Sequence, residues 1–158
     1  MNLADILSME ELISTLVTTV SCGGNLLMNV GPNSDGIIEP IFEERLRSVG
    51  DWLHINGDAI YSSSPWICQN DTLASDIWYT KKSSNVFAFI LSWKTSFILG
   101  CVSPSLNMKM SLLGYNDSIN WEEVQTKEGT RVLVKMPAEG EVTSKWAWVI
   151  KISIEQIP

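Results

Sequence analysis

The sequence has little positive charge and only one histidine. Eleven Lys and Arg residues stand against eighteen Asp and Glu residues, which gives a net charge of −7 at pH 7. No run of like charge offers the basic stripe that releases counterions from a phosphate backbone, so no nucleic-acid partner is expected. With 45% hydrophobic residues in a chain of 158, the composition indicates one or two small globular domains and excludes disorder or a fibrous repeat.

Long apolar runs are also missing. A membrane-spanning helix needs about 18 consecutive apolar residues, and the longest apolar stretch near the start, residues 13–20, is interrupted by threonines. No membrane span is therefore expected. The first residues carry Asp5, Glu10 and Glu11 instead of a basic segment followed by an apolar one, so they are not a secretory signal peptide. Either the protein is cytosolic or its beginning is missing.

Cysteine is scarce and scattered. Cys22, Cys68 and Cys101 form no CxxC or Cys/His pattern, which argues against a zinc site, and no cofactor is indicated. Three cysteines allow at most one internal disulfide, and the spacing leaves the pairing open. Asn70 and Asn116 each begin an N-x-[ST] tripeptide with a non-proline middle residue, so both are candidate N-glycosylation sites.

Two amphipathic helices are expected in residues 1–61. Ser8 and Glu11 form a capping box ahead of the first apolar stripe, and the glycine pair at 23–24 ends that helix. Pro40, a favoured first-turn residue, begins the second helix. The two apolar stripes consist of Leu12, Ile13, Leu16, Val17 and Val20, and of Phe42, Leu46, Val49 and Leu53.

Between these helices, residues 25–30 form a nearly continuous apolar run that stops at a Gly-Pro pair. Such a run is typical of a strand buried on both faces of a parallel sheet. A parallel strand needs neighbours at both edges, and residues 1–61 offer no second strand. Each buried polar group left unpaired would cost about 1–3 kcal/mol. This part is therefore expected to be the closing helix–strand–helix of a (β/α) barrel whose other strands precede residue 1.

From about residue 76 the apolar period changes to two. Phe87, Phe89, Leu91 and Trp93 fall on one face of a run at 86–93, which predicts a strand of a half-buried antiparallel sheet. About seven such strands, at the spacing of a small β-sandwich, are predicted at 76–80, 86–93, 97–102, 108–113, 119–124, 131–136 and 145–152. The polar stretch 62–75 is predicted to be a linker, so the expected domains are 1–61 and 76–158.

Several ordered motifs resemble the α-L-fucosidases of glycoside hydrolase family 29. They are GGNLLMNVGP at 23–32, FEERL at 42–46, INGDAIY at 55–61 and WYT at 78–80. The resemblance covers nearly all the chain and ends near KWAW at 145–148, as in animal lysosomal and secreted members. It implies the end of a catalytic TIM-like (β/α) barrel followed by a C-terminal antiparallel β-sandwich.

The resemblance also implies an activity. Family members remove α-linked L-fucose from glycoproteins and glycolipids with retention of configuration, which needs a carboxylate nucleophile and an acid/base about 5–5.5 Å apart. In the family those residues lie upstream of the motifs matched here, so no catalytic residue is assigned and this chain alone is expected to be inactive. The resemblance further implies fucosylated glycans as partners, a lysosomal or secreted location and a homo-oligomeric full-length protein. A non-catalytic carbohydrate-binding or interaction module is the alternative.

Asn29 is the candidate for the pocket mouth of the full enzyme, because active sites of barrels lie at the C-terminal ends of their strands. The alternative is that Asn29 only hydrogen-bonds the loop that follows. Trp66, Trp78 and Trp121 are the candidate platforms for stacking a sugar ring. The other tryptophans are interpreted as packing residues of the sandwich core or of the second helix: Trp93, Trp146, Trp148 and Trp52.

Carboxylates and the histidine give no catalytic set. The adjacent glutamates at 10–11, 43–44 and 122–123 are neighbours in sequence, and neighbours on a helix or strand point in different directions. His54 lies beside the apolar stripe of the second helix and is expected at a surface or interface.

Overall fold

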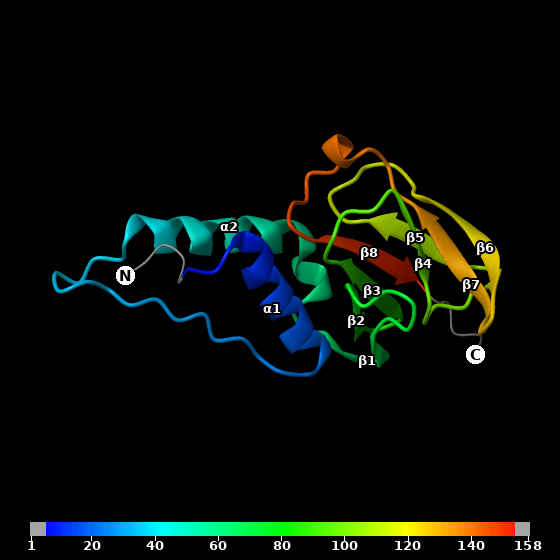
Figure 1. Cartoon of the computed structure of the whole chain (residues 1–158), viewed down its shortest axis with the longest axis horizontal. Helices are drawn as coiled ribbons and strands as arrows, with labels where there is room; N and C mark the ends of the chain where they lie inside the picture. Colours follow the sequence, from blue (N-terminus) through cyan, green and yellow to red (C-terminus); the bar gives the residue numbers. More distant parts are fainter. Residues whose placement is uncertain (1–5, 154–158) are drawn as a thin grey trace.

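The chain folds into a helical part at one end and a two-sheet part at the other (Figure 1). The computed structural model describes residues 6–153. The helices are α1 (Met9–Ser21) and α2 (Pro40–Asn56), and a 3-10 turn, η2 (Gly57–Ala59), follows α2 directly. In this described part, neither helix has the length and apolar character that crossing a membrane requires.

Both helices begin where their sequence signals predict. The Ser8 side chain accepts a hydrogen bond from the Glu11 N–H at 3.2 Å, and the Glu11 carboxylate accepts one from the Ser8 N–H at 2.7 Å. This reciprocal pair is the predicted capping box. Pro40 is the first residue of α2, where its missing N–H is not needed.

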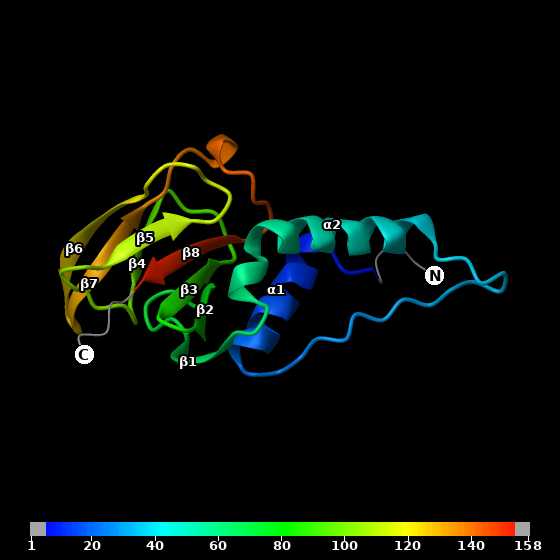
Figure 2. The same cartoon turned by 180° about the vertical axis from the view of Figure 1, so that it is seen from behind.

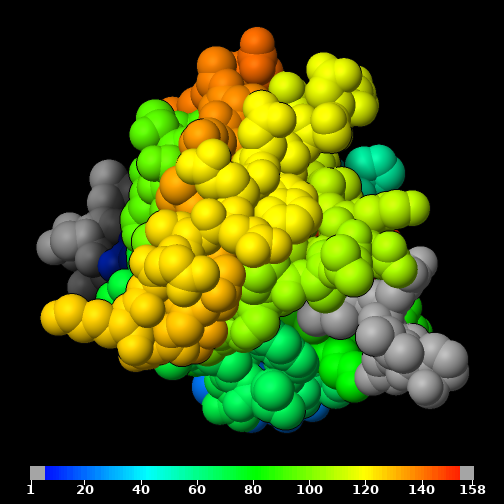
Figure 3. Space-filling view, turned by 90° about the vertical axis from the view of Figure 1, so that its right-hand side faces the viewer, coloured from blue at the N-terminus to red at the C-terminus, as the bar shows by residue number. Residues whose placement is uncertain are grey.

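Eight strands of the described chain form two antiparallel sheets. One sheet has the order β1-β2-β3-β8-β5 and the other the order β4-β7-β6. The space-filling view shows the end of the molecule that β6 and β7 (yellow to orange) cover (Figure 3). The predicted β-sandwich is therefore confirmed. The strands are β1 (Ser64–Asn70), β2 (Ile77–Lys82), β3 (Asn85–Ile90), β4 (Ser96–Leu99), β5 (Lys109–Leu112), β6 (Asn120–Thr126), β7 (Gly129–Lys135) and β8 (Trp148–Ser153).

The strands differ from the sequence prediction most clearly at β1 and β8. β1 lies within residues 62–75, which were predicted as a linker, and it pairs with β2 at the edge of the larger sheet. An edge strand tolerates Pro65, because that residue needs no ladder donor on its outer side. β8 begins at Trp148 instead of residue 145, because Trp146 has a φ of 65°, which is incompatible with a strand.

The central strands are buried on both faces, so the prediction of a half-buried sheet is wrong for β3. Val86, Ala88 and Ile90 belong to the core between the two sheets. Phe87 and Phe89 point the other way and pack with residues of α1 and α2. The helices lie against the outer face of the larger sheet (Figures 1 and 2) and shield its side chains from solvent. One sheet thus serves two cores.

Polar contacts fix α2 to the sandwich. The buried Trp52 donates its Nε1–H to the Ala147 carbonyl at 3.0 Å, and the buried Asn56 amide donates to Ser144 Oγ at 2.9 Å. In β2, Thr80 Oγ1 donates to the Ala59 carbonyl of η2 at 2.7 Å. Because buried polar groups are costly when unpaired, these bonds specify one orientation of the helices on the sheet.

The two sheets are also joined along one edge. Cys68 of β1 and Cys101, which follows β4, form a disulfide, and Cys22 is free and exposed. Beside the disulfide, the buried Asp71 carboxylate accepts hydrogen bonds from the Tyr79 hydroxyl and from the Cys101 N–H. Burial, together with the Asp71 charge, raises the pKa of Tyr79. A covalent bond and a buried hydrogen-bond network therefore close this edge.

The segment at 25–30 is not the predicted buried strand. It runs extended along the outside of the helical part (Figure 2), and no strand in the described residues pairs with it. Leu27 is 90% exposed. The segment has the apolar pattern of a buried strand, but a parallel strand forms only beside neighbours that hydrogen-bond to it. Residues 6–153 provide two helices and two antiparallel sheets, and they form no closed barrel.

Candidate functional site

Asn29 lies at a small hollow between the two helices. It is exposed on the extended segment, and it lines a cavity of about 190 Å³ with Leu12 of α1 and Phe42 of α2. The Arg45 guanidinium closes one side, where its Nε–H donates to the Leu7 carbonyl at 3.2 Å. The surroundings are mainly apolar, so the amide of Asn29 is the polar group that this hollow presents beside Arg45.

The loop that follows is organised by Asn33 and not by Asn29. Asn33 Oδ1 accepts hydrogen bonds from the N–H groups of Asp35 and Ile37, both at 3.0 Å. Gly36, with a φ of 77°, makes the turn. An asparagine that bonds its own following backbone builds such a turn without help. The alternative reading, in which Asn29 serves only to hold this loop, therefore has no contact to support it among the described residues.

The two candidate glycosylation sites have different surroundings. The Asn70 amide nitrogen, the atom that would carry a glycan, donates to the carbonyls of Ser75 and Ile77, each at 2.9 Å. Asn116 is exposed on a bend before β6. A glycosylated amide keeps one N–H, so a glycan fits Asn116 without change, whereas at Asn70 one of the two hydrogen bonds must be released.

All three candidate stacking tryptophans take part in packing. Trp66 and Trp121 are half-buried against the core between the sheets, and the Trp66 ring lies 5.1 Å from that of Tyr79. Trp78 is half-buried against the helices and borders a hollow beside the disulfide. The structure therefore gives each of these rings a packing role.

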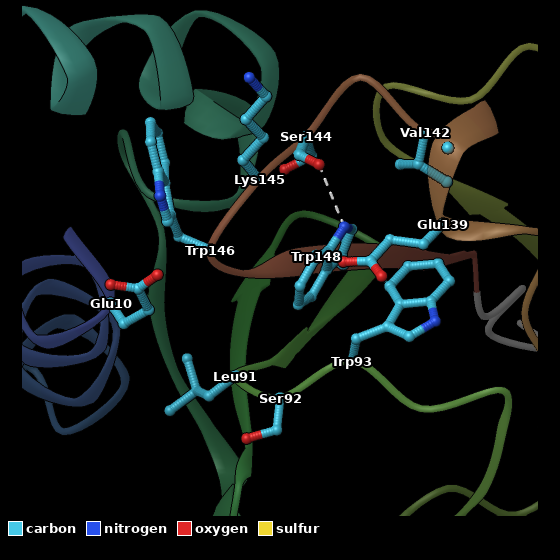
Figure 4. Close-up of a pocket in the computed structure, with 11 residues that line it drawn as sticks. Glu10, Leu91, Ser92, Trp93, Glu139, Val142, Ser144, Lys145, Trp146 and Trp148 are labelled. Carbon is cyan, nitrogen blue, oxygen red and sulfur yellow. Dashed lines mark hydrogen bonds between the residues drawn. The ribbon is translucent and has the colours of Figure 1, made fainter.

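A larger groove instead collects tryptophans that the sequence placed in the core. It has a volume of about 770 Å³ and lies between α1 and the sandwich. Trp93, Trp146 and Trp148 line it together with Glu10 and Glu139 (Figure 4). Sequence patterns could not reveal this groove, because its residues come from three separate stretches and its shape depends on how α1 docks.

The glutamate pairs are divided among different contacts. Glu11 caps α1 while Glu10 faces the groove. In α2, Glu43 forms an ion pair with Arg47 at 2.7 Å, while Glu44 pairs with Arg45. These contacts give each carboxylate its own surface environment, so no acid and nucleophile pair is assigned.

The remaining titratable residues form no metal centre or histidine site. In β6, Glu122 pairs with Lys135 at 3.0 Å. His54 is exposed near the end of α2, as expected for a surface position. Over the described range, no three His, Cys, Asp or Glu side chains gather in a way that would hold a metal ion.

Two family models match nearly the whole chain. The model described as alpha-L-fucosidase matches residues 1–58, and the model of the alpha-L-fucosidase C-terminal domain matches residues 69–153. The chain belongs to the α-L-fucosidase family. The first match ends just after α2, and the second begins within β1.

Relatives in animals extend far beyond the matched region. The chain is 47% identical over 154 residues to an alpha-L-fucosidase of Branchiostoma floridae, a match that covers 95% of this chain and 34% of the relative. It is 42% identical to the human plasma and tissue alpha-L-fucosidases, covering 96% and 97% of this chain and 33% of each relative. The chain thus spans about a third of the length of these α-L-fucosidases.

Solved structures show the same fold. The α-fucosidase of Thermotoga maritima in complex with a mechanism-based inhibitor superimposes with a TM-score of 0.81 at 29% identity, covering 97% of this chain and 36% of that chain. A fucosynthase variant from the same organism, bound to a fucose disaccharide derivative, gives a TM-score of 0.81. The chain corresponds to the C-terminal region of these glycoside hydrolases.

Proposed function

We propose that this chain is the C-terminal third of a retaining α-L-fucosidase, which hydrolyses α-linked L-fucose from glycoproteins and glycolipids. In this proposal, residues 1–61 complete a (β/α) barrel, and the two sheets that begin with β1 form the sandwich that braces it. The chain supplies none of the catalytic carboxylates. The observation that carries the proposal is the apolar segment at 25–30, which lies between α1 and α2 and beside which residues 6–153 place no strand.

An unpaired apolar strand segment is unfavourable in isolation. Its backbone N–H and C=O groups and the exposed Leu27 side chain would be satisfied together if parallel strands were added at its edges. The family model that matches residues 1–58 is that of the α-L-fucosidase itself, and not of its C-terminal domain. Both observations support a barrel whose remaining strands come from the other two thirds of the enzyme.

Fragment complementation tests this proposal. The chain would be co-expressed with the preceding two thirds of the Branchiostoma α-L-fucosidase and assayed with p-nitrophenyl α-L-fucoside. We expect no hydrolysis by the chain alone and clear hydrolysis by the pair. Leu27→Asp should abolish the complemented activity because it places a charge in the strand, whereas Leu106→Asp, at a position equally open to solvent, is the matched control and should leave it intact.

Two results would contradict the proposal: hydrolysis by the chain alone, or a soluble complex of the two parts without activity. The same assay examines Asn29, for which we propose a position at the pocket mouth. In the complemented enzyme, Asn29→Ala should lower kcat/KM by about tenfold, which corresponds to about 1.4 kcal/mol of transition-state binding.

We also infer a secreted or lysosomal location, with N-linked glycans on Asn116 and Asn70 and a homo-oligomeric full-length enzyme. Relatives named as plasma and tissue α-L-fucosidases support the location. The Cys68–Cys101 disulfide supports it too, because such bonds persist in oxidising compartments. The test is the intact mass of the protein secreted from animal cells, before and after enzymatic deglycosylation. An unchanged mass would overturn the inference about glycans.

A further inference from the structure

We propose that the groove between α1 and the sandwich binds a neutral saccharide. Its volume of about 770 Å³ falls in the range of about 300–1,000 Å³ that is usual for small-ligand sites. Glu10 stands on α1 at one wall, and Ser92 follows β3. Trp146 lies just before β8, and Trp148 is the first residue of that strand (Figure 4).

Two of the indoles are held in place before any ligand arrives. Trp148 is 6% exposed, and its Nε1–H donates to the Ser144 carbonyl at 3.1 Å. The half-buried Trp93 ring stands edge-on to it, with ring centroids 4.9 Å apart and planes at 70°. A fixed aromatic surface binds with little loss of side-chain freedom. Such a surface suits the C–H face of a pyranose ring.

The third indole is presented by an unusual backbone. Trp146 has a φ of 65°, a left-handed conformation that bulky residues rarely adopt. The next peptide is pinned, because the Ala147 carbonyl accepts hydrogen bonds from Trp52 at 3.0 Å and from Ser144 at 2.8 Å. Strained residues that surrounding contacts hold in place concentrate at ligand sites. Here the strain brings the half-buried Trp146 ring to the groove.

The polar groups of the groove select the class of ligand. In Figure 4 the dashed hydrogen bond joins Ser144 and Trp148, and the carboxylates of Glu10 and Glu139 form none with the other residues drawn. A free carboxylate accepts hydrogen bonds from hydroxyl groups at both oxygens. The groove is lined by two glutamates, Glu10 and Glu139, and by one lysine, Lys145. This excess of negative charge disfavours binding of a phosphate or an acidic peptide. β3 and β8, the strands that border the groove, are paired on both edges, so neither offers an open edge to a peptide backbone.

Binding is tested on the 158-residue chain by NMR of the indole N–H groups. The probes are methyl α-L-fucopyranoside and lactose, each titrated to about 50 mM, since a single small sugar is expected to bind with a Kd near 1 mM. The indole signals of Trp93 and Trp146 should shift, and those of Trp66, Trp78 and Trp121 should not.

Two variants and a control locate the site. Trp146→Gly removes the indole and relieves the left-handed backbone, and Glu10→Gln removes one charge at an exposed position. Each should weaken binding by about tenfold. Glu123→Gln, an equally conservative change at an exposed position of β6, should not change it. Absence of any shift with both probes, or an affinity that both variants leave unchanged, would overturn the proposal. Neither result depends on fucosidase activity.

Discussion

The segment at 25–30 and strand β3 have nearly the same apolar character, but they have opposite fates in the structure. β3 pairs with β2 on one edge and β8 on the other, and both of its faces are buried. The 25–30 segment is extended and has no strand beside it in the described chain, and its Leu27 is 90% exposed. Composition therefore sets the capacity of a segment to be a buried strand, and its neighbours decide whether it becomes one.

The largest expected effect comes from a matched pair of substitutions to alanine, one in each region. Phe87→Ala empties a fully buried position between β3 and the helices, so it should lower the free energy of unfolding by about 3–5 kcal/mol. Leu27→Ala removes an exposed side chain and should change it by less than about 0.5 kcal/mol. Urea denaturation measures both. Similar losses for the two variants would show that Leu27 is buried in solution and that the contrast is wrong.

A smaller effect tests how firmly the helical part joins the sandwich. Trp52→Phe removes the indole N–H that bonds the Ala147 carbonyl and leaves part of a buried volume empty. We expect a loss of about 2 kcal/mol in thermal or urea unfolding. Trp121→Phe, at a half-buried position of β6, is the control and should cost less than about 1 kcal/mol. Separate unfolding of the two parts in the wild type would contradict the shared core.

The smallest expected effect is electrostatic. Asp58 accepts hydrogen bonds from Lys82 at 2.9 Å and Lys151 at 3.1 Å, and these contacts hold its pKa below the ordinary value of 3.8. A lowered folded-state pKa contributes stability above the unfolded pKa, and that contribution is lost as the pH falls through the folded value.

Asp58→Asn should therefore lower the free energy of unfolding at pH 7. The loss should be below about 1 kcal/mol, because the carboxylate is partly exposed and screened. Below about pH 4 the difference between variant and wild type should shrink. The measurement is urea unfolding at several pH values. A difference that grows towards acid would show that the two lysines do not stabilise the charged form.

The helix starts could be predicted from the sequence because their signals are local. The capping box at Ser8 and the first-turn Pro40 need only residues within one turn, and both were correct. The sandwich was also predictable, because alternation of apolar residues is a local property of each strand. β1 was missed although Trp66 and Cys68 alternate inward, since serines and Pro65 at its start resemble a linker.

Features that depend on distant contacts could not be predicted in this way. Asp71 is the middle residue of a glycosylation tripeptide in the sequence, yet its carboxylate is a buried hub that Tyr79 and Cys101 share. Trp146 was assigned to a strand, because nothing in its neighbours signals a positive φ. The second core on the outer face of β3 depends on where the helices dock, which no periodicity records.

The disulfide has a consequence for the order in which the protein assembles. Cys68 and Cys101 are separated by 33 residues, and both precede β7 and β8 in the chain. β7 and β8 are the partners that β4 and β3 need. Because chains fold from the N-terminal side during synthesis, the covalent link can hold β4 near the β1–β2 pair before β7 pairs with β4. The disulfide can therefore fix the relative position of the two sheets before all of their strands are in place.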